Sequence, residues 1–330
     1  GQCYWFPKPS VNNNDSPKAG KIYNGEKAES GDYPFLLEEV HLHLHGLTVE
    51  NPLGKTTIIT TTQPGLNTDL FIFSSLFQHT LWPPKRVAIE HTWFGQFCGG
   101  SVLNEYWVIT AAHCFIEEKA PDIVQVRAGS LEIDEGGTVH KAEKIIVHNK
   151  FGKPFLFDND ITLIKVENRL DENPYVAFVN LPTSHTKILK SGVKVYAAGW
   201  GITSSVKNWG KSGDELVSES NRLSGVRSNF LLKITLNILD HNKCAKADFF
   251  KRYQDADLKL TNNMICTLTI GKDTTAGDSG GPLLLREGAN MTLVGIVSFG
   301  EGTGKRGDPG VYTKVANYQT WIHKNTHSVS

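Results

Sequence analysis

Short runs of Val, Ile, Leu and Thr recur along this 330-residue chain, separated by Gly, Pro, Asn and Asp. Such runs, bounded by turn residues, are typical of an all-β sandwich or barrel, whereas the 3.6-residue periodicity of a helix bundle is scarce here. An exception lies near the C-terminus, where Val315, Tyr318 and Ile322 follow at helical spacing. We therefore predict an all-β protein with a C-terminal helix.

Composition excludes some classes of function. The chain has 34 Lys and Arg and 34 Asp and Glu, so no net field attracts nucleic acid or an anionic membrane surface. No apolar stretch approaches the roughly 20 residues that a membrane-spanning helix needs. We expect neither nucleic acid nor a membrane as a partner.

The five cysteines form no C-x-x-C pair, so their spacing predicts no zinc site. Two disulfides with one thiol left over would indicate an oxidising, extracellular compartment. The sequons at Asn14 and Asn290 add little, because such triplets are common by chance. The cysteines are Cys3, Cys98, Cys114, Cys244 and Cys266.

Three segments carry residues suited to catalysis. WVITAAHC (residues 107–114) delivers His113, DNDITLIKV (residues 158–166) contains Asp160, and GDSGGPLLL (residues 277–285) holds Ser279 in a glycine-rich turn. Each has an ordinary structural explanation when taken alone, as a structural histidine, a turn acid or a tight bend. Together they supply what acyl transfer needs: a nucleophile, a base, and a carboxylate that orients the base.

The order His, Asp, Ser with these flanks resembles the chymotrypsin/trypsin family of serine proteases, over about residues 22–35 and most of residues 87–322. The resemblance implies two antiparallel six-stranded β-barrels. The N-terminal barrel would span residues 22–182, and the C-terminal barrel with its terminal helix residues 183–330. It also implies a secreted serine endopeptidase that acts through an acyl-enzyme and uses no cofactor and no metal.

The catalytic roles carry over from the family. Ser279 would be the nucleophile, His113 the base that takes its proton, and Asp160 the carboxylate that orients the imidazole. The backbone N–H groups of Gly277 and Ser279 would form the oxyanion hole.

Specificity also follows from the resemblance, because the residue six positions before the nucleophile lies at the base of the S1 pocket. That residue is Asp273, and a buried carboxylate demands a cationic partner, which implies cleavage after Arg or Lys. The segments VSFG and PGVYTKV resemble the pocket walls and place Ser298, Gly300 and Gly310 at the substrate. The disulfide that usually ties these loops is replaced by Thr275 and Thr303.

Activation has its own signature. GKIYNGEKAESGDYPF (residues 20–35) resembles the family's activation site, with Lys21–Ile22 as the bond cut by an activating protease. The new amino group of Ile22 would pair with Asp278, and residues 1–21 would be a pro-segment. The motif departs from the family pattern at Tyr23 and Asn24.

The resemblance pairs Cys98 with Cys114 and Cys244 with Cys266. Cys3 resembles a pro-segment cysteine whose usual partner position carries none here, so we expect it to be free or bonded to another chain. The family's calcium loop would correspond to residues 128–137, where Ser130 stands in place of a carboxylate, and we expect no calcium.

Residues 37–86 interrupt the family pattern. Family members pass from PF to CGG within about two short strands, and these residues lack clear caps or turns. We predict an insertion in the N-terminal barrel, or non-coding sequence translated in a predicted gene product. The alternating His41, His43 and His45 within it have no identifiable acidic or thiol partner, which disfavours a metal site.

Two alternatives stay open: a catalytically impaired homologue that acts as a binding or cofactor protein, and an active protease with a preference other than Arg or Lys. The expected partners are protein or peptide substrates, an activating protease and proteinaceous inhibitors. Residues 201–230 resemble an enlarged autolysis loop that could be cut at Arg222 or Arg227.

Overall fold

The computed structural model describes residues 26–27, 85–116, 120–183, 186, 189–205, 225–288, 290–301 and 307–327. All of them belong to one unit of the chain, Gly1–Glu29 with Pro83–Ser330. Several predictions therefore concern residues outside the described ones: Cys3, Asn14, Lys21, Ile22, the three histidines, residues 37–84, Arg222 and Thr303.

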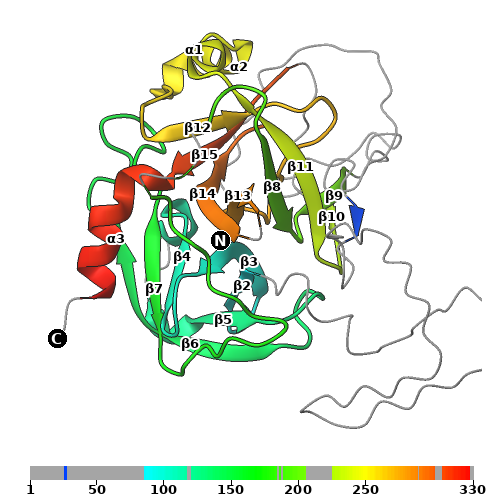
Figure 1. The fold of residues 1–330 in the computed structure, drawn as a ribbon, viewed down its shortest axis with the longest axis vertical. Helices are drawn as coiled ribbons and strands as arrows, with labels where there is room; N and C mark the ends of the chain where they lie inside the picture. Colours follow the sequence, from blue (N-terminus) through cyan, green and yellow to red (C-terminus); the bar gives the residue numbers. More distant parts are fainter. Residues whose placement is uncertain are drawn as a thin grey trace, which may run out of the picture. The chain divides into compact units, whose positions relative to one another are not determined.

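The first barrel is closed and antiparallel, with strand order β2-β3-β4-β7-β6-β5 (Figure 1). Its interior holds the apolar face of each strand; Val87, Ile89, Val126 and Ile164, for example, are all buried in one cluster. The strands are β2 (Arg86–His91), β3 (Gly95–Val102), β4 (Trp107–Thr110), β5 (Val124–Ala128), β6 (Thr138–Val147) and β7 (Thr162–Val166).

Six strands of a seven-stranded sheet close the second barrel, because β8 pairs with both β13 and β11. In β11 every second residue from Leu232 to Ile238 is buried, the alternation expected of a strand with one face in the core. The strands are β8 (Lys194–Gly199), β11 (Leu232–Leu239), β12 (Met264–Thr267), β13 (Pro282–Glu287), β14 (Asn290–Phe299) and β15 (Gly310–Lys314). The two closed barrels confirm the predicted fold class.

Two boundaries differ from the sequence-based limits. Arg86, the last residue of the expected insertion, is the first residue of β2 and pairs with Ser101. The seventh strand of the second sheet, β1 (Glu26–Lys27), pairs with Lys233 and Leu232 of β11. The segment after Ile22 therefore contributes to the C-terminal sheet, although its position in the chain had assigned it to the N-terminal barrel.

The helices are short. The predicted C-terminal helix begins as a 3-10 turn, η5 (Val315–Tyr318), and continues as α3 (Gln319–Thr326), drawn in red in Figure 1. Val315, Tyr318 and Ile322 are buried as their spacing predicted. No helix among the described residues is long and apolar enough to span a membrane. The remaining elements are η1 (His113–Phe115), η2 (Pro121–Ile123), β9 (Ile202–Ser205), β10 (Gly225–Arg227), α1 (His241–Ala245), α2 (Asp248–Arg252) and η4 (Gln254–Ala256).

Candidate active site

His113 and Asp160 meet because they flank two paired strands. His113 opens η1 just after β4, Asp160 lies just before β7, and β4 pairs with β7 at Thr110 and Thr162. The backbone N–H of His113 donates to Oδ1 of Asp160 at 2.8 Å, and its Nδ1 lies 2.8 Å from Oδ2. A carboxylate accepts only, so it favours the imidazole tautomer with a proton on Nδ1 and leaves Nε2 as a proton acceptor.

The carboxylate of Asp160 is wholly buried and receives a third donor from the C-terminal barrel. The hydroxyl of Ser298 in β14 donates to Oδ2 at 2.5 Å, and Thr313 in β15 donates to the Asp160 carbonyl at 2.7 Å. Donors from both barrels therefore hold this buried charge. The sequence places Ser298 at the substrate, which stays a prediction; in the structure its hydroxyl bonds the carboxylate of Asp160.

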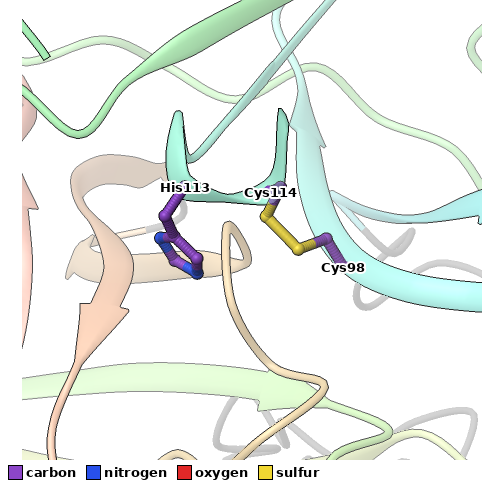
Figure 2. Close-up of side chains that lie close together, drawn as sticks. All are labelled: Cys98, His113 and Cys114. Atoms are coloured by element: carbon purple, nitrogen blue, oxygen red, sulfur yellow. A yellow bond between two sulfur atoms is a disulfide. The ribbon is translucent and has the colours of Figure 1, made fainter. Parts of the chain in front are cut away.

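A disulfide anchors the segment that carries His113. Cys114, the next residue, is bonded to Cys98 of β3, and Figure 2 shows the imidazole and the disulfide leaving the same short segment. These three residues are the only cluster of potential metal ligands among the described ranges. Two of its three ligand atoms are sulfurs consumed by the disulfide, which leaves no thiolate to bind a metal. The second expected disulfide, Cys244–Cys266, is also present.

Removing the first disulfide should destabilise the fold. The bonded cysteines are 16 residues apart, and closing a loop of this size contributes about 3 kcal/mol in the chain-entropy model. We expect the double variant Cys98→Ala/Cys114→Ala to lose about that much free energy of unfolding, measured by urea denaturation. Cys3→Ser, which removes a cysteine but neither bridge, is the control. Equal stability of the two variants would refute the prediction.

The turn that carries Ser279 packs against the first barrel. The carbonyl of Ser279 accepts a hydrogen bond from the N–H of Gly99 at 2.7 Å. Gly280 has φ +77°, and a Cβ there would overlap the hydroxyl of Thr110, so this position requires glycine. Thr110 is the last residue of β4, and the turn therefore lies beside the segment that leads to His113.

The expected triad also needs a contact between the side chains of Ser279 and His113. Among the hydrogen bonds of the described residues, none joins Oγ of Ser279 to His113. In enzymes without substrate this bond is often long or poorly aligned and tightens only when substrate binds. The structure thus brings together His113 and Asp160 by direct hydrogen bonds and Ser279 by the packing of its backbone.

The peptide before Gly277 has a fixed orientation. The Ala276 carbonyl accepts from the N–H of Ile202 at 2.9 Å. In a trans peptide the N–H points opposite to the carbonyl, so the Gly277 N–H faces away from Ile202. Gly277 itself has φ +95°, and its carbonyl accepts from the side-chain amide of Gln96 at 2.9 Å. This loop can therefore present a fixed N–H donor to a developing negative charge.

Asp273, Gly300 and Gly310 lie together. Asp273 is buried, with 2% of its surface exposed, and Oδ1 accepts from the N–H of Thr274 at 2.9 Å. A Cβ on Gly310 would lie 2.5 Å from that oxygen, and a Cβ on Gly300 would lie 3.3 Å from Cα of Gly310. The two glycines therefore place no side chain of their own next to the carboxylate. Burial is the largest cause that raises the pKa of Tyr312, and the negative charge of Asp273 is the second.

The loop compared with a calcium site satisfies its polar groups internally. The Ser130 hydroxyl lies 2.8 and 2.5 Å from the carbonyls of Glu132 and Glu135, which share its one proton, and it accepts from the N–H of Glu132 at 2.9 Å. The Asp134 carboxylate accepts from the N–H of Gln96 at 3.2 Å. The polar contacts of this loop are thus made within the loop and with β3.

The chain resembles known proteins over most of its length. Residues 77–322 match the family model described as Trypsin. Anionic trypsin of Bos taurus is 38% identical over 234 residues, which are 69% of this chain and 79% of that protein. Serine protease 1 of Homo sapiens is 37% identical over 248 residues, 74% of this chain and 84% of that protein. The chain therefore belongs to the trypsin family and is a serine-type endopeptidase.

Proposed function

We propose that this protein is a secreted endopeptidase, activated by cleavage of the Lys21–Ile22 bond, that hydrolyses peptide bonds after Arg or Lys through His113, Asp160 and Ser279. The observation that carries the proposal is the pair of 2.8 Å hydrogen bonds between His113 and Asp160, beside the turn that holds Ser279. The two disulfides favour an oxidising, extracellular compartment.

The chemistry follows from these positions. Nε2 of His113 takes the proton of Ser279 as Oγ attacks the substrate carbonyl, and Asp160 stabilises the imidazolium. The N–H groups of Gly277 and Ser279 bind the oxyanion. The imidazolium then gives its proton to the leaving amine, which departs as the acyl-enzyme forms. Water, activated by the same imidazole, hydrolyses the acyl-enzyme and restores Ser279.

The geometry supports an approach of Ile22 to Asp278. Lys27 in β1 faces Leu232 of β11, and Leu232 faces Gly199 of β8 on its other side. The carboxylate of Asp278 lies against Gly199. Ile22 is four residues before Glu26, a reach of about 14 Å in extended chain. An amino group freed at Ile22 can therefore reach this carboxylate.

Partners follow from this role. The substrates are proteins or peptides, as in the rest of the family. An activating protease would cut after Lys21, proteinaceous inhibitors would occupy the same site as substrates, and Cys3 would be free or link to another chain.

Active-site labelling tests the proposal against the catalytically impaired alternative. The chain cut at Lys21 is treated with a fluorescent fluorophosphonate, which reacts only with an activated serine. We expect stoichiometric labelling, located to Ser279 by peptide mapping and abolished in Ser279→Ala. The exposed Ser191→Ala is the matched control and should label normally. A cut, folded chain that takes up no label would favour a binding protein.

A further inference from the structure

Arg86 is a buried cation next to the active-site turn. Its side chain is 2% exposed and that of Asp278 is 0% exposed, and Nη2 of Arg86 lies 3.8 Å from Oδ1 of Asp278. Nη1 donates to the carbonyl of Ala198, and Nη2 donates to the carbonyl of Gly277 at 3.5 Å. One guanidinium therefore contacts the residues on both sides of the Gly277–Asp278 peptide bond.

The surroundings have room for this guanidinium only because three positions lack side chains. A Cβ built on Gly99 or on Gly281 would overlap the guanidinium nitrogens, and a Cβ on Gly199 would lie 2.8 Å from Nη1 and overlap the Asp278 carboxylate. The ring of Trp200 covers the guanidinium, with Cζ 5.1 Å from the ring centroid, a distance suited to a cation–π contact. These contacts come from β3, from the end of β8 and the residue after it, and from the turn before β13, so they surround the cation.

The buried carboxylate needs this charge. Burial raises the pKa of Asp278, and Arg86 is the strongest influence in the opposite direction. Burial lowers the pKa of Arg86 to about 10, and the charge of Asp278 opposes that change. Each charge therefore stabilises the other, because a lone buried charge would cost several kcal/mol.

The same carboxylate fixes the loop of the oxyanion hole. Oδ1 of Asp278 accepts from the N–H of Gly201 at 3.0 Å, and Oδ2 accepts from the N–H of Thr275 at 2.9 Å. The bond from Thr275 closes the turn that carries the Gly277 N–H, and the bond from Gly201 ties that turn to a neighbouring loop. An ionised Asp278 strengthens them, since hydrogen bonds to a charged acceptor are the stronger kind.

We propose that Arg86 is a positioning residue that neutralises Asp278 in the uncut chain, so that the oxyanion loop is ordered before the Lys21–Ile22 bond is cleaved. This inference rests on the function proposed above and concerns its regulation. The amino group of Ile22 is then a second cation for a carboxylate that already has one. The uncut protein accordingly has substantial activity, and cleavage raises it only moderately.

The test compares uncut and cut full-length chains. Lys21→Gln blocks cleavage, and each chain is assayed for the rate of fluorophosphonate labelling and for kcat and KM on a small Arg amide. We expect uncut Lys21→Gln to be labelled within about 10-fold of the cut parent. Adding Arg86→Gln should slow labelling of the uncut chain by roughly 100-fold or more. In the cut chain Arg86→Gln should cost less than about 10-fold, because Ile22 supplies the charge.

Two further variants separate positioning from structure. Arg86→Lys keeps the charge and should restore most of the labelling in the uncut chain, whereas Arg169→Gln, which removes an exposed arginine, should change nothing. A purely structural role for Arg86 predicts equal losses in cut and uncut chains, and that result would overturn the inference. If Arg86→Gln does not fold, the labelling rate of the uncut Lys21→Gln chain alone tests the inference, because that chain has no free amino group at Ile22.

The outcomes also separate this inference from the function itself. An uncut chain that takes no label while the cut parent labels well overturns the role of Arg86 and leaves the proposed function intact. Undiminished labelling of the uncut Lys21→Gln/Arg86→Gln chain would also overturn the role of Arg86 and leave the proposed function intact. Failure of the cut parent to label would instead overturn the proposed function.

Discussion

Asp160→Asn is expected to lower kcat by about 10⁴-fold, the loss that the same change at this position produces in the trypsin family, with little change in KM for a small substrate. Asp160 accepts from both the backbone N–H and Nδ1 of His113. An amide of the same size can turn its NH₂ group toward Nδ1, which then must accept a hydrogen bond. The proton moves to Nε2, and the imidazole can no longer take the proton of Ser279.

A second buried acid in the same loop is the matched control. Asp158 accepts from Thr261 and Asn263 at 3.1 and 2.9 Å, and its side chain is buried like that of Asp160. We expect Asp158→Asn to lower kcat less than about 10-fold, because its partners hold the loop and not the imidazole. Steady-state kinetics on folded variants provide the comparison. Equal losses in the two variants would show that the loop, and not the tautomer of His113, determines the rate.

The fold was predictable because its strands are short apolar runs between turn residues, a local pattern. The terminal helix was predictable for the same reason, from the spacing of Val315, Tyr318 and Ile322. The sequence analysis counted the segment of β1 with the N-terminal barrel, whereas β1 pairs with β11, a contact across some 200 residues of chain. Periodicity carries no information about such pairings.

Two contacts at the site, Ser298 with Asp160 and Arg86 with Asp278, could not be predicted from the sequence for the same reason. Ser298 lies 138 positions from Asp160 along the chain, and the direction of its hydroxyl depends on how β14 packs against the first barrel. Arg86 starts an apolar run at the edge of residues that read as an insertion, where an arginine is normally solvated. Only folding brings it to Asp278. A cue existed in retrospect: glycines at 99, 199 and 281 leave room for a long side chain.

Asp273→Asn is expected to reduce the preference for Arg over Leu at the cleaved position by about 10²- to 10³-fold in kcat/KM. The carboxylate of Asp273 is buried beside two glycines, which place no side chain of their own next to it. A substrate guanidinium that reaches it gains a counter-charge out of water, and removing one partner of a buried pair costs about 3–5 kcal/mol. A neutral side chain gains no such contact, so cleavage after Leu should change little.

Profiling with a peptide library, on the parent and on Asp273→Asn, measures this ratio directly. Asp255→Asn is the control, because it removes one exposed carboxylate from the C-terminal barrel. The folded state should tolerate Asp273→Asn, since the amide keeps the size of the side chain and takes a charge out of the interior. Activity lost equally for all substrates would assign Asp273 to structure. A parent protein that shows no preference for Arg or Lys would instead establish the alternative of a different cleavage preference. The replacement of a loop disulfide, with Thr275 at one of its positions, left that alternative open.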